Sequence, residues 1–581
     1  MVQGELLLLL AAHLVLTALP GAAAALFVAS RGERRIPILL VVALAASGLG
    51  GLLGFWIYYG DHAAGQTWSY LLAFGAALAT GWILFERKIP GDVLRGLATP
   101  LALWMLGSVF LVFLGFVHGG TGAPLGTAAT RFELQLPSDN DIPLFFAEFF
   151  YTHSHHGPIA VFPGEWLASD RPPLQVGYLL SQQPFAFNSA ELNYEVLGVC
   201  LQQLWIVGLW ALLVAARVGR RTKALAMITV LVSDLAIVHG FFVWPKMLPA
   251  AFLLAAAALI LTPLWDELRG KLWAGALIAA LFGLAMMGHG SSVFAIVPLA
   301  LVAAFRGLPS RRWLGVALAV FLVVMLPWSA YQKWGDPPGN RLLKWQLAGV
   351  VELDGRGTLE TLKDAYSEAG LGGTIHNKAE NFVVVAGGGP FVTYIRHAID
   401  DLGEGDWSGA VQETRWSIFY YLLPSMGLLL LGPIAMLIGR RRRRRGDRPA
   451  EWKLAREALI VTAVGIVFWC LLMFGNGASR AVIHQGSYLL PLLGMVAGIC
   501  GLRAVWPRVG TWLIAVWAVF SLALYVPYTP AQEGTSFSVF SALIGAVCLL
   551  GYCLVAFGRG RGGEAPTAPE PPAAVAIDSP A

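Results

Sequence analysis

The feature that most constrains this chain is the recurrence of apolar runs of about 20 residues along nearly its whole length. A run of this length can cross the hydrocarbon core of a bilayer as one helix, and an ordinary soluble protein does not contain so many of them. Apolar residues make up 57% and charged residues only 13% of the 581 residues. We therefore predict an all-α polytopic integral membrane protein, a helical bundle of about 15 transmembrane helices.

The loops between the apolar runs predict the orientation. The runs lie at about 5–28, 36–59, 68–86, 97–117, 195–217, 223–241, 246–264, 271–288, 290–306, 312–330, 417–439, 455–475, 481–502, 510–528 and 536–557. Basic residues follow the odd-numbered runs, as in Arg34 and Arg35, Arg87 and Lys88, and the run Arg440 to Arg445. The positive-inside rule places these loops in the cytoplasm, the N-terminus outside and the C-terminus inside a cell membrane. The first run lacks the basic start of a cleavable signal peptide, and the run from Arg440 is typical of a topology anchor.

The predicted topology leaves two long loops outside, at about 118–194 and 331–416. We divide the chain into N-terminal transmembrane helices (1–96), a transmembrane core that includes the first external loop (97–330), a second external loop subdomain (331–416), C-terminal transmembrane helices (417–560) and a disordered cytoplasmic tail (561–581). Both loops mix aromatic, acidic and basic residues, as small folded units do. The polar chemistry of the protein is therefore expected at the outer face.

Carboxylates occur twice in the first external loop. Asp139 and Asp141 precede "IPLFFAEFFY", an apolar segment typical of a short interfacial helix that carries Glu148. In "SDRPPLQVG" two prolines hold Asp170 and Arg171 in a rigid, extended segment. The alternatives are that Asp139 only caps a helix and that Asp170 and Arg171 only form a local ion pair. Two such segments in one external loop favour a functional site.

Basic and histidine side chains near the outer helix ends extend the candidate set. They are Lys246, His289, Arg341, Lys344, Arg480 and His484. Arg341 and Lys344 are three residues apart, so both can face one way on a short helix and grip an anion. The alternatives are a turn capped by Asn340 for this segment and side chains that reach lipid headgroups for Lys246 and Arg480.

Other motifs are weaker indications of a functional site. The five cysteines lie inside apolar runs, so we predict neither a disulfide nor a zinc site. "THSHHG" brings His153, His155 and His156 together, but its spacing matches no strong metal site and surface histidines are common. The three glycines of "VAGGGP" lack a Rossmann or Walker context, which argues against a nucleotide site. Asp234 is the one carboxylate that we place in the hydrocarbon region, where it should face the bundle.

The order of these motifs resembles the GT-C superfamily of membrane glycosyltransferases. Members include protein mannosyltransferases, aminoarabinose transferases and envelope arabinosyltransferases, in which an acidic motif in the first large external loop is followed by an interfacial helix and an "HPPL" or "PPL" element, similar to "DRPPLQ" here. "FFVWPKMLPAAFLL" (241–254) is similar to a lysine-bearing helix start, and "SRAVIHQGSYLLPLL" (479–493) to a late "RYLLPLLP"-like helix. The resemblance covers about 97–495, with short and degenerate motifs. It departs from the family because the acidic loop follows the fourth apolar run rather than the first.

The resemblance implies a polyprenyl-phosphate-linked sugar as donor and a glycan, lipid or protein hydroxyl as acceptor. The implied catalytic residues are Asp139, Asp141 and Glu148, with one aspartate as the base. The implied substrate-binding residues are Asp170, Arg171, Lys246, His289, Arg341, Lys344, Arg480 and His484, of which the basic ones would stabilise the leaving phosphate. No cofactor is required, although Mg²⁺ or Mn²⁺ between Asp139, Asp141 and the phosphate is chemically reasonable. Membrane lipids are expected partners and nucleic acids are not.

Two other classes of protein remain as alternatives. A transporter or flippase for an envelope lipid or polysaccharide predicts inverted repeats and charges deep in the helices. A ligase or polymerase of lipid-linked glycans shares the external site and the lipid donor. The concentration of polar residues in two external loops favours an enzyme over a transporter.

Overall fold

The computed structural model describes residues 2–86, 89–134, 136–153, 166–353, 355–439, 448–526 and 537–558. Within these ranges the chain is all-helical and contains no strand. Among the described residues, eleven helical segments are long and apolar enough to cross a membrane, or twelve if a bent helix pair counts as one span. One of the eleven, Thr358–Glu404, lies in the predicted second external loop. The predicted all-helical fold is confirmed, and the number of long apolar helices supports a polytopic membrane bundle. The expected anchor at Arg440 to Arg445 and the tail 561–581 lie outside the described residues.

The helices form three consecutive groups along the chain. The N-terminal group is α1 (Val2–Ser30), α2 (Ile36–Gly60), α3 (His62–Tyr70), α4 (Ala76–Glu86) and α5 (Gly91–Gly115). The central group is α9 (Ala190–Gln202), α10 (Trp205–Ala215), α11 (Arg220–Leu231), α12 (Asp234–Phe241), α13 (Met247–Ile260), α14 (Trp265–Leu268), α15 (Leu272–Gly288), α16 (Val293–Arg306) and α17 (Arg311–Ala330). The C-terminal group is α22 (Leu422–Met426), α23 (Leu431–Gly439), α24 (Ala450–Leu472), α25 (Leu489–Val505), α26 (Pro507–Tyr525) and α27 (Val539–Phe557).

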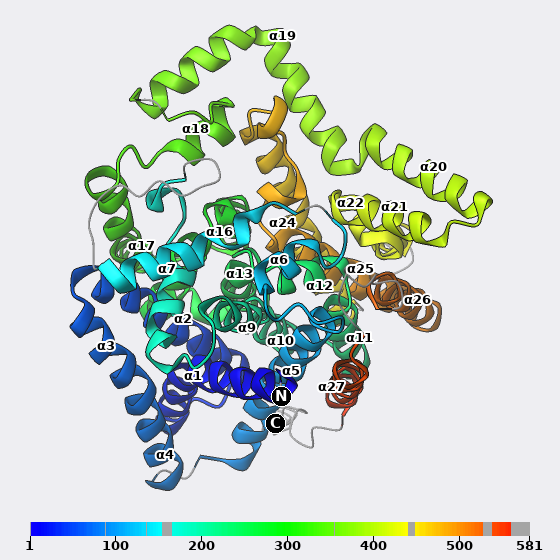
Figure 1. Cartoon of the computed structure of the whole chain (residues 1–581). Coiled ribbons are helices and arrows are strands. Elements are labelled where there is room, and N and C mark those ends of the chain that lie inside the picture. Colours follow the sequence, from blue (N-terminus) through cyan, green and yellow to red (C-terminus); the bar gives the residue numbers. More distant parts are fainter. Residues whose placement is uncertain are drawn as a thin grey trace, which may run out of the picture.

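The central helix of the bundle is α13, which Figure 1 shows among α9, α10 and α16. All of its residues are buried, and it packs on α10, α15 and α2. Its sequence is apolar on every side, as expected for a helix that protein surrounds completely. Its run of alanines allows neighbouring backbones to approach closely.

Four of the predicted spans are shorter than expected. α13 and α16 have 14 residues each, and α15 and α25 have 17. At the usual rise they cover about 21 to 26 Å, less than the roughly 30 Å of a hydrocarbon core. Helix length therefore supports eleven or twelve spans rather than fifteen. The short helices end at polar segments such as "GHGSS" and "HQGSY", which contain candidate site residues.

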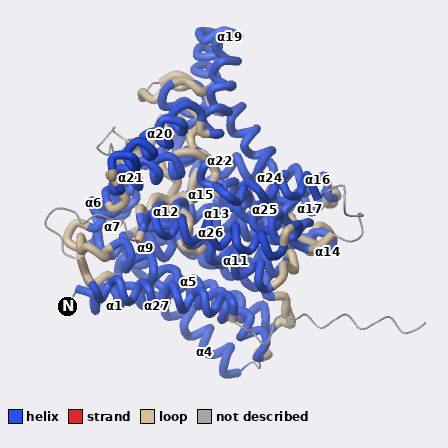
Figure 2. The backbone as a smooth tube through the Cα atoms, turned by 90° about the vertical axis from the view of Figure 1, so that its right-hand side faces the viewer, coloured by secondary structure: helices blue, strands red, loops and turns tan. Residues whose placement is uncertain are grey.

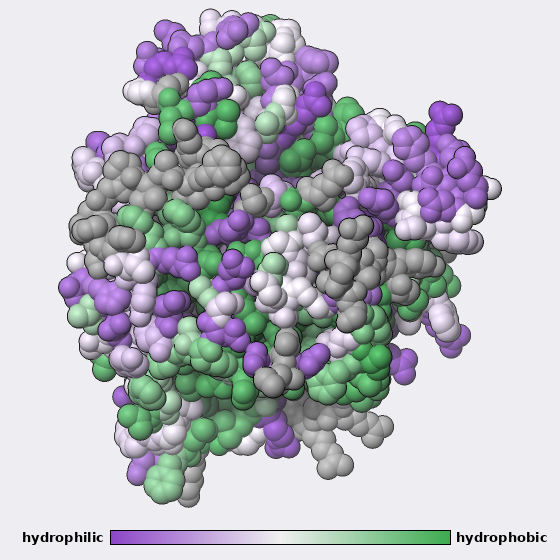
Figure 3. All heavy atoms as spheres, in the orientation of Figure 1, coloured by the Kyte–Doolittle hydropathy of each residue, from purple (hydrophilic) through white to green (hydrophobic). Residues whose placement is uncertain are grey.

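The two long loops are largely helical. The first contains α6 (Pro124–Thr130), α7 (Ile142–His153) and α8 (Leu174–Gln182), and the second contains α18 (Arg341–Ala348), α19 (Thr358–Ala386), α20 (Gly388–Glu404) and α21 (Trp407–Phe419). Gly370 (φ 62°) breaks α19, and Gly387 (φ 111°) separates it from α20; both conformations suit glycine. Figure 1 shows α19 and α20 at the edge of the molecule, and Figure 3 shows hydrophilic residues gathered over them.

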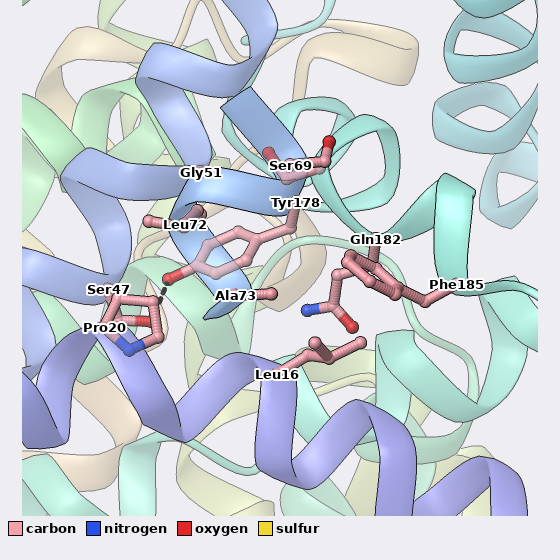
Figure 4. Close-up of a pocket in the computed structure, with 11 residues that line it drawn as sticks. Leu16, Pro20, Ser47, Gly51, Ser69, Leu72, Ala73, Tyr178, Gln182 and Phe185 are labelled. Carbon is pink, nitrogen blue, oxygen red and sulfur yellow. Dashed lines mark hydrogen bonds between the residues drawn. The ribbon is translucent and has the colours of Figure 1, made fainter. Parts of the chain in front are cut away.

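The segment that follows the double proline is packed into the bundle. Tyr178 of α8 reaches the hydroxyl of Ser47 of α2 at 2.9 Å, as Figure 4 shows. Gln182 of α8 bonds His13 at 2.8 Å and Thr17 at 3.0 Å, both in α1. α8 is therefore held against the N-terminal helices, which limits the movement of the proline segment before it.

Candidate functional site

The stretch "SDRPP" is hydrogen-bonded to the segment that directly follows α17. The backbone N–H of Ser169 donates to Asp336 Oδ2 at 2.8 Å, and Gln332 donates to the carbonyl of Ser169 at 2.9 Å. Asp170 accepts from the backbone N–H of Leu167 at 3.0 Å. Asp170 and Asp336 are both buried. The prolines therefore sit in a segment that the bundle fixes from two sides.

Two arginines lie against one tryptophan beside this segment. The guanidinium carbons of Arg171 and Arg341 are 4.6 and 4.5 Å from the ring centre of Trp166. Arg171 Nη2 is 3.3 Å from Asp139 Oδ2, and Arg341 Nη1 is 3.9 Å from Asp170 Oδ2. The alternative of a local Asp170–Arg171 pair is therefore not what forms, since each of these residues has its closest opposite charge on another segment. Trp166 orders both cations by stacking.

Local bonds position Asp139. It lies in a short 3-10 turn, Ser138–Asn140, just before α7. The side chain of Asn140 donates to the carbonyl of Leu125, and the hydroxyl of Tyr194 donates to the carbonyl of Asn140 at 2.6 Å. The turn is thus tied to α6 and α9, which directs Asp139 toward Arg171.

Lys246 lies beside this cluster and is buried, with 3% of its surface exposed. Its Nζ is 4.5 Å from the ring centre of Trp244 and 5.8 Å from that of Tyr488. The charges of Arg171 and Asp139 both act on it. The ring centre of His289 is 6.3 Å from that of Trp244, and the charges of Lys246 and Arg171 act on the imidazole. Lys246 and His289 therefore lie near the Asp139–Arg171 region.

A second polar group adjoins Lys246. The hydroxyl of Tyr488 is 2.7 Å from His239 Nε2 and 3.1 Å from His484 Nδ1. His239 ends α12, and Tyr488 and His484 precede α25. His484 is thus connected to the cluster through Tyr488, above whose ring Lys246 lies.

Asp141 and Glu148 belong to a different, acidic neighbourhood. The negative charge of Glu191, at the start of α9, acts on both carboxyl groups, and the charge of Asp139 also acts on Asp141. Burial raises the pKa of each of these two carboxyl groups, and the neighbouring negative charge raises it further. The structure therefore brings Asp139, but neither Asp141 nor Glu148, next to the basic cluster.

The two remaining basic candidates, Lys344 and Arg480, lie in different surroundings. Lys344 is buried on α18 on the same side as Arg341, as the three-residue spacing predicts. Asn340 makes no capping bond to α18 and donates instead to Thr358 at 3.1 Å. Arg480 is half-exposed and lies 3.3 Å from Glu380 of α19, in a surface ion pair.

Burial also acts on the acidic residues of the site. It raises the pKa of Asp170 to about 6, against the opposing effects of its Leu167 hydrogen bond and of Arg341. Burial raises the pKa of Asp336 as well. Both carboxyl groups thus hold their protons more strongly than an exposed aspartate.

Sequence reasoning missed several groups. Trp166, Asp336, Trp244, His239 and Tyr488 all contact or adjoin the cluster. A polar residue within an apolar run is a usable signal, and it would have found His239. Asp234 is not the only buried carboxylate of the apolar runs, because Glu195 of α9 has no exposed surface. In the described part of the chain, both oxygens of each of these two carboxylates lack a hydrogen-bond partner.

Metal binding finds no support in this geometry. Among the described residues no three histidine, cysteine or acidic side chains are grouped as metal ligands. Asp139 Oδ2 is paired with the Arg171 guanidinium at 3.3 Å. The side chains of His153, His155 and His156 lie outside the described set.

Comparison with known proteins adds no relative to this description. The chain matches no protein-family model, no curated protein and no solved structure.

Proposed function

We propose that this protein is an integral membrane glycosyltransferase that moves a sugar from a polyprenyl-phosphate-linked donor to an envelope glycan, lipid or protein at the outer face of the membrane. The observation that supports this best is one carboxylate, Asp139, beside a buried group of cations on Trp166. A carboxylate next to ordered cations suits a reaction in which a hydroxyl loses a proton to a base while a phosphate leaves.

Each part of the cluster has a role in the proposed step. Asp139 takes the proton of the acceptor hydroxyl as its oxygen bonds to the anomeric carbon. The bond between that carbon and the phosphate oxygen breaks, and its electron pair leaves with the polyprenyl phosphate. Arg171, Arg341 and Lys246 stabilise the charge that develops on the phosphate. Arg171 exchanges part of its contact with Asp139 for the phosphate, which frees the carboxylate to act as base. No step is routed through a metal ion.

A transporter or flippase is the second candidate, and one observation favours it. Asp234 and Glu195 are fully buried carboxylates in apolar segments and lack hydrogen-bond partners in the described structure. Such groups are typical of ion or proton pathways. A ligase or polymerase of lipid-linked glycans would use the same external cluster.

The test is sugar transfer from a radiolabelled polyprenyl-phosphate donor pool to endogenous acceptors in membranes. Asp139→Asn keeps the shape of the side chain but removes the base, so we expect transfer to fall by roughly 10²- to 10⁴-fold. Asp141→Asn should retain most activity, because the charges that act on Asp141 are those of Asp139 and Glu191 and not those of the basic cluster. Arg171→Lys keeps the charge but loses the planar contact with Trp166, so we expect weaker use of the donor.

Asp400→Asn is the matched control, because Asp400 is an exposed carboxylate on α20 that pairs only with Arg396 in the described structure. Protein level and the thermal unfolding midpoint in detergent show that each variant is folded. Equal transfer by wild type, Asp139→Asn and membranes without the protein would overturn the proposal and favour a transporter.

A further inference from the structure

An apolar groove separates α16 from α17, although the two helices are consecutive. α17 packs on α15 and α16 packs on α24, and Figure 1 shows the two apart. The groove has a volume of about 370 Å³ and is floored by α13 and α15. Its walls include Ala300 and Ala304 of α16 and Ala317 of α17. Leu314 and Leu318 at its rim are 46% and 59% exposed, so it opens toward the membrane.

The groove has the length of one bilayer leaflet. It runs along α17 from Trp313 to Phe321 and along α16 from Ile296 to Ala304. Eight residues of helix correspond to about 12 Å, close to the roughly 15 Å half-thickness of a hydrocarbon core. An apolar space of this kind does not hold water, because water finds no polar partners there. A single acyl chain fits both its length and its chemistry.

One end of the groove is polar. Trp265 and Trp313 line it with ring centres 5.8 Å apart, and they are 1% and 6% exposed. In the described structure neither indole N–H has a hydrogen-bond acceptor. A buried N–H without an acceptor is costly, so an acceptor atom brought by a ligand would stabilise this end.

Positive charge surrounds the same end. Arg311 and Arg312 begin α17, and Arg269 and Lys271 lie between α14 and α15. Arg269 packs over Gly307, in the loop that joins α16 to α17, so closely that a side chain at Gly307 would displace it. Asp266 and Glu267 oppose these charges, but Glu267 already binds Arg35 at 2.7 Å. Basic side chains therefore outnumber acidic ones where the groove ends.

We propose that this groove binds an anionic phospholipid of the bilayer leaflet at this end of the bundle. One acyl chain lies between α16 and α17. The phosphate is held by Arg311 and Arg312, and the indole N–H groups of Trp265 and Trp313 donate to phosphate or ester oxygens. Figure 2 shows α14 at the side of the molecule opposite α6 and α7, so this site is separate from the Asp139 cluster and does not depend on the proposed function.

The test is lipid titration followed by native mass spectrometry of the full chain in detergent. Phosphatidylglycerol is the anionic probe and phosphatidylcholine the zwitterionic one. Ala317→Phe fills the groove, and we expect it to weaken the tightest phosphatidylglycerol site by roughly tenfold or more. Val323→Phe is the matched control, because Val323 is 72% exposed on the same helix and does not line the groove.

The headgroup is tested separately. Arg311→Gln with Arg312→Gln should weaken phosphatidylglycerol roughly tenfold and leave phosphatidylcholine unchanged. Arg508→Gln, an exposed arginine on α26, should change neither. Ala300→Phe blocks the opposite wall if Ala317→Phe does not fold.

Three results would overturn the proposal. The first is unchanged binding in the groove-filling variants, and the second is equal affinity for both lipids in the wild type. The third is displacement of phosphatidylglycerol from this groove by polyprenyl phosphate, which would assign the groove to that lipid instead.

Discussion

At the residue scale, Asp170 is the acidic side chain of the candidate site whose protonation state burial affects most clearly. It lies between the arginine pair and Asp336, and burial raises its pKa from 3.8 to about 6 despite Arg341 at 3.9 Å. The charged form is therefore less favourable in the folded protein than in the unfolded chain. Linkage then gives the sign, because the folded state binds more protons than the unfolded state between these two values, and stability falls as pH rises through that range.

The corresponding prediction concerns stability against pH. As the pH rises from below 4 to above 6, the wild type should lose on the order of 3 kcal/mol relative to Asp170→Asn, which stays neutral and can still accept from Leu167. Thermal unfolding in detergent, followed by the fluorescence of the 21 tryptophans, measures the difference. Similar midpoints for the two proteins are expected at pH 4.

Asp336→Asn is the companion variant, because burial raises the pKa of Asp336 too and the amide oxygen can still accept from Ser169. If Asp170→Asn is less stable than wild type by the same amount at pH 4 and pH 7, Asp170 is ionised throughout. The ion pair with Arg341 would then outweigh the cost of burial.

At the element scale, the contact between α2 and α8 positions the proline segment. A Cβ atom on Gly177 would lie 2.1 Å from the carbonyl oxygen of Gly51, a backbone atom that cannot rotate away. α8 begins at Leu174, directly after the two prolines. A change that separates α8 from α2 therefore moves Asp170 and Arg171 as well.

We predict that Gly177→Ala lowers stability by roughly 1 to 3 kcal/mol, the usual cost of overpacking, and reduces activity in the transfer assay. Gly126→Ala in α6 is the control, because nothing lies within 4 Å of the added carbon. Alanine favours a helix over glycine, so this control should be neutral or slightly stabilising. A thermal unfolding midpoint of Gly177→Ala equal to wild type would show that the two helices can shift apart without cost.

At the scale of the whole molecule, the polar elements separate to two ends. α6, α7 and α21 lie at one side of the bundle and α14 at the other, as Figure 2 shows. The basic loops next to α14 predict a cytoplasmic location for that side. The Asp139 cluster would then face outward, where a lipid-linked sugar is presented.

Cysteine labelling in intact cells tests this orientation. A cysteine at exposed Asp400 on α20 should react with a membrane-impermeant maleimide from outside. A cysteine at exposed Arg312, at the start of α17, should react only after permeabilisation. The wild type is the blank, because Cys200, Cys470 and Cys500 are buried and Cys548 and Cys553 are half-buried. The reverse pattern would invert the topology and move the candidate site to the cytoplasm.

The sequence by itself determined the class of the protein and much of its helix pattern. Long apolar runs and helix-ending residues act locally, so they can be interpreted without knowing the neighbours of a segment. α7 after Asp141 and the short helix that begins at Arg341 were found in this way. The number of spans was overestimated, because four of the predicted runs form helices of only 14 to 17 residues, which are short for a bilayer crossing.

Only the tertiary structure decided which candidate residues meet. Arg171 pairs with Asp139, 32 residues earlier, and Ser169 binds Asp336, 167 residues later. Asp141 is two positions from Asp139, and yet no cation of the cluster acts on it, while Arg480 pairs with Glu380 at the surface. Such pairings depend on how distant helices pack against each other, and the direction of a side chain follows from that packing. Spacing along the chain does not predict these pairings, because packing in a bundle of this size brings together loop segments that are far apart in sequence.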